Sequence, residues 1–240
     1  MSYRLLLLFL SFYLFCTLSQ AQDPGSGAQI DSLLQIIEED AKPLEARLSA
    51  YEQLLERGHD KFSGDSLLSL AQDFMELAKD QPLYTARATE AIAMGYRRKN
   101  EHKKADSTFE VALKMYQTIG DEKGQGTTWE ELAIQEFRSG DKQLALAKFD
   151  SSIYHARKAK DQITEASALK NKGTTLAALS QYQRSLDLLE QPLQIFQEIG
   201  NQQGMASIYN DRGTVYGRMG KYDKTLEEFN KSLVIRREMK

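Results

Sequence analysis

The residues of this chain that could do chemistry are few and far apart. Gly64-Asp65-Ser66-Leu67 is a four-residue block in which Ser66 could act as the nucleophile of ester hydrolysis. Such a serine needs a histidine base with an orienting carboxylate, and the chain contains no Asp-x-x-His element. The block also opens a helical pattern, in which we expect Asp65 to cap the helix. The sequence therefore argues against a hydrolase built around Ser66.

The other reactive residue types also fail to form a site. His59, His102 and His155 lack the close spacing that a metal ion, or a general base with its partner, requires. The glycines of residues 120–126 are not followed by the Lys-Ser or Lys-Thr pair that holds a phosphate, so we interpret this segment as a turn. Cys16 is the only cysteine. We expect no catalytic residue, no metal, no cofactor, no small-molecule substrate and no enzyme activity.

Composition favours a folded chain with a sizeable core and no affinity for nucleic acid. The chain has 240 residues, of which 41% are apolar and 27% charged, and its formal net charge is −3. Phosphate binding needs clustered Lys and Arg whose charge is not neutralised. The basic stretch at residues 97–104 crosses a predicted turn between helices and is expected to be a solvated corner. We do not expect a nucleic-acid partner.

The first residues have the features of a secretory signal peptide. Arg4 precedes an apolar run, Leu5 to Leu18, which is followed by a small-residue cleavage pattern ending at Ala21. The run is short for a bilayer core that takes about 20 apolar residues, so we favour cleavage after Ala21 over an uncleaved anchor. A lipid anchor at Cys16 is disfavoured because the bulky Phe15 precedes it. We expect the mature chain to be exported, to a periplasmic or other extracytoplasmic location.

Apolar residues recur at spacings of three and four, which predicts helices, and from Thr85 onward the chain repeats itself every 40 residues. This period is typical of solenoids, in which each unit buries its apolar face against its neighbours. The columns are Ala93, Ala133, Gly173 and Gly213; Phe109, Phe149, Leu189 and Phe229; and Leu113, Ile153, Leu193 and Leu233. The small residues are expected where the first helix of a pair crosses the second. We predict helix pairs at 85–99 with 101–119, 127–139 with 141–159, 163–179 with 181–199, and 204–219 with 221–238.

These columns resemble the tetratricopeptide repeat (TPR), which sets Trp, Leu, Gly and Tyr on its first helix and Ala and Phe on its second. The best units carry Trp129, Leu132, Ala133, Ala145 and Phe149, and then Tyr209, Gly213, Tyr216 and Phe229. The pattern's terminal proline is missing, six further residues lengthen each unit, and Lys172 and Arg212 replace its leucine. The resemblance implies an all-α fold, a right-handed α-α superhelix of antiparallel helix pairs.

The expected organisation has four parts: a signal peptide (1–21), a flexible leader (22–29), degenerate N-terminal helix pairs (30–84) and TPR-like repeats (85–240). We place the repeats at about 85–124, 125–164, 165–204 and 205–240. The last predicted helix would present Leu226, Phe229, Leu233 and Val234 to water. We therefore expect either that the array continues beyond this fragment or that another copy covers this face.

In the resembled family, one face of each first helix lines a concave groove that receives extended peptides or partner helices. At 100° per residue this face holds Ser207, Asn210, Thr214, Gly217 and Arg218 in the last pair. Carried over by column, the other candidate partner-binding residues are Arg87, Glu90, Met94, Arg97 and Arg98; Thr127, Glu130, Ile134, Phe137 and Arg138; and Ser167, Lys170, Thr174, Ala177 and Ala178.

The predicted groove is cationic on a chain that is acidic overall. Six of the candidate residues are basic, against Glu90 and Glu130, so the expected partner is a protein or peptide with acidic segments. We expect the carboxylates of that partner to be bound by Arg97, Arg98, Arg138 and Lys170. The alternative is a solvated wall without a fixed ligand, because any exposed helix face carries charges.

Exported arrays of this repeat length resemble the extracytoplasmic sensory parts of bacterial signalling proteins. This resemblance implies a non-catalytic protein-interaction or sensory-input module. The alternative is the N-terminal regulatory part of a membrane-bound kinase, cyclase or transcriptional regulator, whose output domain is absent from this sequence. Contact with a membrane would then depend on a further downstream segment or on an uncleaved leader. A membrane span and a catalytic motif downstream would decide for this alternative.

Overall fold

The computed structural model of this chain describes residues 24–39, 41–58 and 62–239, which form helices joined by turns and no strand. The expected signal peptide lies outside these residues. The helices are α2 (Pro24–Glu38), α3 (Leu44–Gly58), α4 (Gly64–Ala78), α5 (Pro82–Arg98), α6 (His102–Ile119), α7 (Glu122–Ser139), α8 (Lys142–Ala159), α9 (Gln162–Ala178), α10 (Tyr182–Glu198), α11 (Gln202–Arg218) and α12 (Tyr222–Glu238). None of these helices is long and apolar enough to span a bilayer. The all-α prediction is confirmed.

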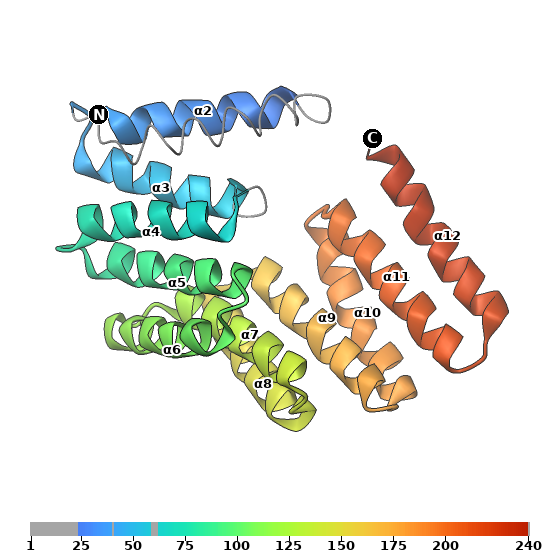
Figure 1. The fold of residues 1–240 in the computed structure, drawn as a ribbon. Helices are drawn as coiled ribbons and strands as arrows, with labels where there is room; N and C mark the ends of the chain where they lie inside the picture. Colours follow the sequence, from blue (N-terminus) through green and yellow to red (C-terminus); the bar gives the residue numbers. More distant parts are fainter. Residues whose placement is uncertain (1–23, 40, 59–61, 240) are drawn as a thin grey trace. The chain divides into compact units, whose positions relative to one another are not determined.

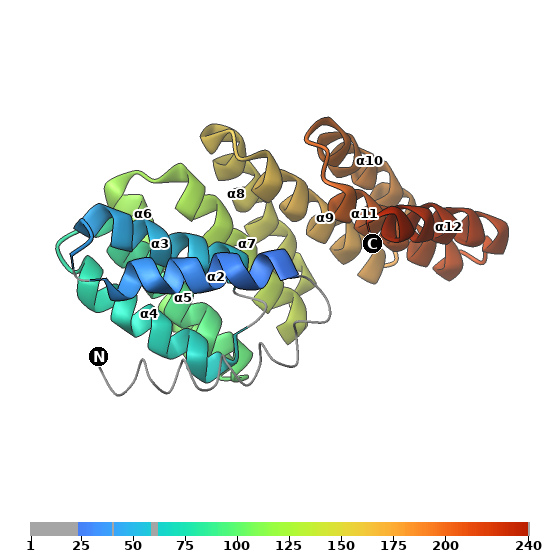
Figure 2. The same cartoon turned by 90° about the horizontal axis from the view of Figure 1, so that it is seen from above.

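The helices fall into two compact units, and the first, Met1–Ile119, contains α2 to α6. These helices lie side by side in chain order (Figure 1), and Figure 2 views them from above. Their core runs from α2 to α5, and within it the rings of Tyr51 and Phe74 stack with centroids 5.2 Å apart. α2 begins at Pro24, inside the segment expected to be a flexible leader, because proline fits the first position of a helix.

The second unit, Gly120–Lys240, consists of three helix pairs. α7 packs on α8, α9 on α10 and α11 on α12, and each pair also contacts the next through α8 with α9 and α10 with α11. Phe149 on α8 is buried among Ala133 and Leu169, and Leu189 on α10 is buried with Ile208 of the following pair. The predicted pairing is therefore confirmed in this unit, and α5 with α6 forms the corresponding pair in the first unit.

The column of small residues lies where it was predicted, at the crossing of the two helices of each pair. Ala93 and Ala133 are fully buried. A Cβ atom added to Gly173 would lie 2.8 Å from Cδ2 of Leu189, and one added to Gly213 would lie 2.6 Å from Cδ1 of Phe229. These separations are shorter than ordinary carbon contacts, so each glycine lets its helix approach the next one more closely than alanine would.

The turns between helices repeat every 20 residues with one conformation. A residue with positive φ, between 56° and 103°, stands at each of the positions Asn100, Gly120, Gly140, Lys160, Ser180, Gly200 and Gly220. The next residue often caps the following helix: Asp141 accepts from the amide of Leu144 at 2.9 Å, and Asn201 accepts from Gly204 at 2.8 Å. This left-handed residue followed by a capping side chain ends one helix and starts the next within three residues.

The predicted start of α7 at residue 127 is wrong. α7 starts at Glu122, so Gly124 and Gly126 lie inside the helix and are buried, although we expected them in a turn. A Cβ atom at Gly126 would come within 3.2 Å of the backbone nitrogen of Ala156 on α8. Ser152 of α8 donates its hydroxyl hydrogen to the carbonyl of Gly126 at 2.8 Å. The glycine here permits close packing of two helices and does not break one.

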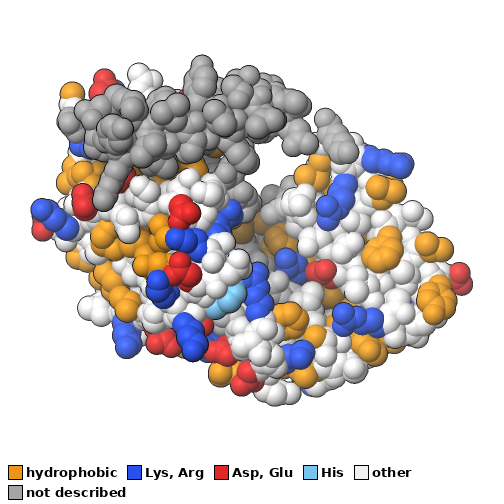
Figure 3. All heavy atoms as spheres, viewed as in Figure 1, with side chains coloured by type: hydrophobic (Ala, Val, Ile, Leu, Met, Phe, Trp, Pro, Cys, Tyr) orange, Lys and Arg blue, Asp and Glu red, His pale blue; other side chains and the backbone are white. Residues whose placement is uncertain are grey.

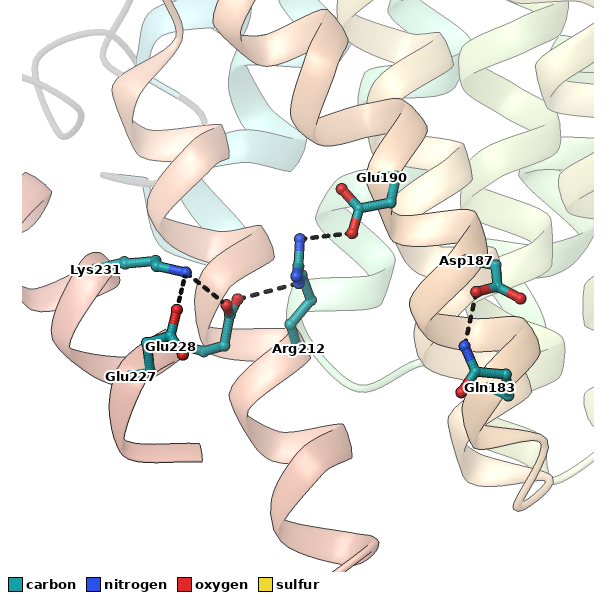
Figure 4. A network of polar contacts seen from close by, with 7 residues as sticks. All are labelled: Gln183, Asp187, Glu190, Arg212, Glu227, Glu228 and Lys231. Carbon is teal, nitrogen blue, oxygen red and sulfur yellow. Dashed lines mark hydrogen bonds and ion pairs between the residues drawn. The ribbon is translucent and has the colours of Figure 1, made fainter. Parts of the chain in front are cut away.

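The two cations that replace leucine in the repeat pattern are held by carboxylates. Lys172 on α9 pairs with Asp150 of α8. Arg212 on α11 pairs with Glu190 of α10 at 2.8 Å and with the buried Glu228 of α12 at 3.0 Å (Figure 4). Glu228 also pairs with Lys231, so its buried charge has cations on two sides. The substitutions therefore exchange an apolar contact for an ion pair between neighbouring helices.

Candidate partner-binding surface

The predicted partner-binding residues lie on the first helices of the pairs. In the second unit these are α7, α9 and α11, and α9 contacts both α7 and α11. We call the surface that these three helices form with their predicted residues the first-helix face. In the first unit the corresponding helix is α5, which carries the remaining predicted residues.

Glu130 of α7 is the best-anchored residue of the first-helix face. Its Oε1 accepts hydrogen bonds from the hydroxyl of Ser167 and, at 2.8 Å, from the side-chain amide of Asn171, both on α9. Burial raises the pKa of the Glu130 carboxyl, although these two donors and the nearby Lys170 act in the opposite direction. The contact joins α7 to α9.

Lys170 of α9 lies between two carboxyl groups of neighbouring first helices. Its charge acts on Glu130 of α7 and on Asp211 of α11. Burial raises the pKa of Asp211 from 3.8 to about 6, and Lys170 only partly offsets this effect. Asp211 therefore changes charge close to neutral pH.

Asp211 was not among the predicted residues, because we placed the site by strict column, which selects Asn210. Two hydrogen bonds between first helices join residues 41 apart, Glu130 with Asn171 and Arg218 with the carbonyl of Ala177, and a third, Ser167 with Glu130, joins residues 37 apart. Lys170 and Asp211 are also 41 apart. A spacing of the repeat length plus one was the signal that could have identified Asp211.

Three further predicted residues of this unit are exposed at the ends of the face, whereas the predicted Ala177 is buried and the predicted Ile134 and Phe137 pack against the core. Arg138 of α7 and Asn210 of α11 are exposed to solvent. Arg218 of α11 is also exposed, and its guanidinium donates to the carbonyl of Ala177 on α9 at 3.4 Å. The face thus combines two partly buried carboxyl groups and one lysine at its middle with two exposed arginines.

On α5, in the first unit, two predicted residues are engaged by other helices. Arg87 pairs with Glu52 of α3, and its guanidinium also lies 5.7 Å from the ring centroid of Tyr84. Glu90 accepts a hydrogen bond from the hydroxyl of Tyr116 on α6 at 2.8 Å. Much of the hydrogen-bonding capacity of this pair is therefore used within the protein.

The two arginines at the end of α5 are also in contact with protein groups. The guanidinium of Arg97 lies 5.9 Å from the ring centroid of Phe109 on α6. Arg98 donates to the carbonyl of Phe62, which precedes α4, at 2.7 Å. The structure thus leaves Arg138, Lys170 and Arg218 as the cations best placed to meet an incoming partner.

The residues that suggested other chemistry have structural partners. Ser63 caps α4 by accepting from the amide of Ser66 at 3.1 Å, so the prediction that Asp65 is the cap is wrong. Asp65 pairs with Lys99 at 2.6 Å. His155 lies 2.6 Å from a carboxylate oxygen of Glu122. Within the part of the chain that the structure describes, no cluster of His, Cys, Asp and Glu side chains is arranged to hold a metal.

The first-helix face carries side chains that can form hydrogen bonds and ion pairs with an incoming chain. Its amide, hydroxyl and carboxyl groups can exchange hydrogen bonds with an extended backbone, and its cations can pair with acidic side chains. Space-filling Figure 3 shows basic and acidic side chains interspersed on the viewed side of the molecule, without a continuous block of one sign.

No family model matches this sequence, and no curated protein matches it in sequence. Solved structures match it in fold. BtubC from P. vanneervenii has a TM-score of 0.71 and 19% identity, covering 90% of this chain and 93% of its own. The apo form of RapI has a TM-score of 0.61 and 10% identity, covering 97% and 98%. A kinesin light chain-like protein of nearly identical TPR-like repeats from Podosopora anserina has a TM-score of 0.57 and 14% identity, covering 81% and 97%. With its 40-residue helix pairs and its small residues at each crossing, the chain therefore has the fold of the TPR-like helical repeats.

Proposed function

We propose that this chain is a non-catalytic protein-interaction or sensory-input module that binds a peptide or protein segment along the first-helix face. The observation that carries the proposal is the set of polar side chains of α7, α9 and α11 joined by contacts between residues 41 apart. These contacts fix the side chains on three helices at once, so a partner would meet a pre-organised surface and would lose little binding energy to ordering it.

The proposed partner segment is acidic. Arg138, Lys170 and Arg218 provide three cations on the first-helix face, and the two carboxyl groups among them have raised pKa values, which weakens their opposing charge as the pH falls. An acidic segment running across α7, α9 and α11 would meet an arginine at either end and the lysine at the middle.

Binding of labelled peptides tests this proposal. The probes are three fluorescent peptides of equal length, rich in Glu, Lys or Gln, and the readout is fluorescence anisotropy at low and high salt. We expect the Glu-rich peptide to bind best and to lose affinity with added salt. The double variant Arg138→Glu with Arg218→Glu should weaken it roughly ten-fold or more, since two attractive charge pairs become repulsive.

Arg184 on α10 is a matched control, because it is exposed and its guanidinium donates to the side-chain carbonyl of the nearby Gln181 at 2.5 Å. Arg184→Glu changes the net charge by the same amount per site but lies on a second helix. Equal weakening by both variants would mean that the peptide responds only to overall charge. Absence of binding by all three peptides would contradict an acidic partner.

We further propose that the module works outside the cytoplasm, either on its own or as the regulatory part of a membrane-bound signalling protein. The support is the apolar run Leu5 to Leu18 after Arg4, followed by the small-residue pattern ending at Ala21. Fusion of residues 1–21 to a reporter enzyme that is active only after export tests this proposal. Replacing Leu7 and Leu8 by Arg should abolish export, and a reporter that stays inactive with the natural segment would contradict it.

A further inference from the structure

One face of α12 carries large apolar side chains that water reaches. Tyr222 is 72% exposed, Leu226 62%, Phe229 38% and Leu233 44%. Apolar side chains are visible on the surface over α12 in Figure 3, when compared with the position of α12 in Figure 1. A run of this kind along one helix face marks an interaction surface more often than a solvated one.

The same columns are covered in the preceding pairs of this unit. Phe149 and Leu189, which correspond to Phe229, are 1% and 0% exposed, and Leu193, which corresponds to Leu233, is 7% exposed. The cover over Leu189 and Leu193 includes Ile208, from the first helix of the following pair. The cover that fits this face of α12 is therefore the apolar side of another helix.

The spacing of the exposed residues matches that required for pairing two helices. Tyr222, Leu226, Phe229 and Leu233 are separated by four, three and four residues, which places them in a single stripe along α12. At 100° per residue they lie within about 60° of one another. Two copies of such a stripe, one from each chain, can pack against each other as two paired helices.

The charges beside the stripe are ordered along α12. Its first half carries Asp223, Glu227 and Glu228 with Lys224 and is net negative, and its second half carries Lys231, Arg236 and Arg237 with Glu238 and is net positive. Glu227 also pairs with Lys231 of the same helix at 2.6 Å. Asp223 and Arg237 form no ion pair with any other described residue. When two copies of α12 run antiparallel, the acidic half of each helix faces the basic end of the other, so the helix complements itself.

From this stripe and this charge order we propose that α12 binds α12 of a second copy of the chain, antiparallel, in a two-fold symmetric dimer. The matching register sets Leu226 against Leu233 of the second copy. The same register brings Asp223 opposite Arg236 and Arg237 of the second copy, twice by symmetry. The two-fold axis then passes between Phe229 and Asn230.

Analytical ultracentrifugation of the chain over a range of concentrations tests the association. We expect a monomer–dimer equilibrium that Leu226→Glu together with Leu233→Glu shifts toward monomer by roughly a hundred-fold, because carboxylates would be placed in the apolar seam. Ile163→Glu is the matched control, since Ile163 on α9 is 62% exposed and lies away from the stripe. A monomer at all concentrations, or equal weakening by Ile163→Glu, would overturn the proposal.

Charge reversal tests the direction of the two helices. Carboxylates in the first half of α12 also stabilise the helix through its dipole, so removing them would change the stability of the helix as well as that of the dimer. The test therefore exchanges the charges between the two ends and does not remove them. Asp223→Arg should weaken the dimer, and adding Arg236→Asp with Arg237→Asp should restore it, because the facing pairs are then reversed. Failure of this rescue would overturn the antiparallel arrangement.

Cross-linking locates the axis independently of stability. In a chain carrying Cys16→Ser, the variant Asn230→Cys should form a disulfide-linked dimer on mild oxidation, since the two cysteines lie beside the two-fold axis. Lys224→Cys lies on the opposite side of α12 and should stay monomeric on oxidation. Cross-linking at 224 but not at 230 would overturn the register. The ultracentrifugation, charge-reversal and cross-linking experiments do not depend on binding of a peptide to the first-helix face.

Discussion

Replacing Asp211 by asparagine should make the second unit more stable at neutral pH and remove part of its pH dependence. Asp211 is partly buried on α11, and burial raises its pKa from 3.8 to about 6. Its proton is bound more tightly in the folded state than in the unfolded state. The contribution of Asp211 to stability therefore falls as the pH rises from about 4 to about 6, and stays at the lower level above that range.

The size of the effect follows from the two pKa values. Each pKa unit is worth about 1.4 kcal/mol, so a rise from 3.8 to about 6 sets an upper limit of about 3 kcal/mol on the cost of the ionised carboxyl. Asparagine keeps the shape of the side chain but loses the attraction of Lys170, and Asp211 is not completely enclosed. We therefore expect Asp211→Asn to gain about 2 kcal/mol at pH 8 and about nothing at pH 4.

Urea denaturation followed by circular dichroism at several pH values measures this difference. Because repeat arrays do not always unfold in one step, the midpoints are best combined with an NMR titration of the Asp211 carboxyl carbon. The matched control is Asp187→Asn on α10, where the carboxylate is exposed and accepts from Gln183 at 2.8 Å. An Asp211→Asn chain that keeps the natural pH profile, or is less stable at pH 8, would refute the reasoning.

Four further substitutions are expected to change stability, two of them raising it and two lowering it, and thermal unfolding measures each of them. Gly173→Ala should destabilise the protein by about 1 to 2 kcal/mol, because the clash of the new Cβ atom with Leu189 outweighs the better helix propensity of alanine. Gly217→Ala should instead stabilise it by up to about 1 kcal/mol, because the atom nearest to its Cβ would be 3.6 Å away. Lys160→Gly should stabilise by about 0.5 to 1 kcal/mol, since Lys160 has a φ of 56° that glycine adopts without a Cβ clash; an unchanged or lower melting temperature would count against strain at this turn. Arg212→Met should cost about 1 to 3 kcal/mol, because the buried Glu228 loses one of its two cations and keeps Lys231. Adding Glu228→Leu should recover most of that loss, and a double variant no more stable than the single one would contradict a buried ion pair.

The repeat period was enough to predict the helix pairs, the crossings and the exposure of Leu226, Phe229, Leu233 and Val234 on α12. These features depend on the sizes of side chains within one repeat, and the sequence gives those sizes directly, as at Gly173 and Gly213. The start of α7 was missed because glycine was taken as a turn signal, whereas Gly126 is selected by the backbone of α8 lying against it. Local sequence does not reveal how closely a later helix approaches.

The candidate site was predicted less well, because the availability of a charge depends on residues outside its own repeat. Arg87 lies in the expected column, but Glu52 from the aperiodic part of the chain pairs with it. Arg98 is similarly engaged by the carbonyl of Phe62. Asp211 was missed because the hydrogen bonds between first helices join residues 37 or 41 positions apart, whereas the site was placed by columns 40 positions apart. Periodicity alone contains no information on these spacings.

The turns that recur every 20 residues also restrict how the length of this protein can change in evolution. Each turn consists of one left-handed residue and a capping position, and it is too short to accommodate an added residue. One residue inserted within a helix rotates every later side chain of that helix by about 100°, which would expose the crossing column and bury the charged face. Insertions and deletions are therefore tolerated mainly as whole helix pairs. Relatives of this protein should differ in length by multiples of 40 residues.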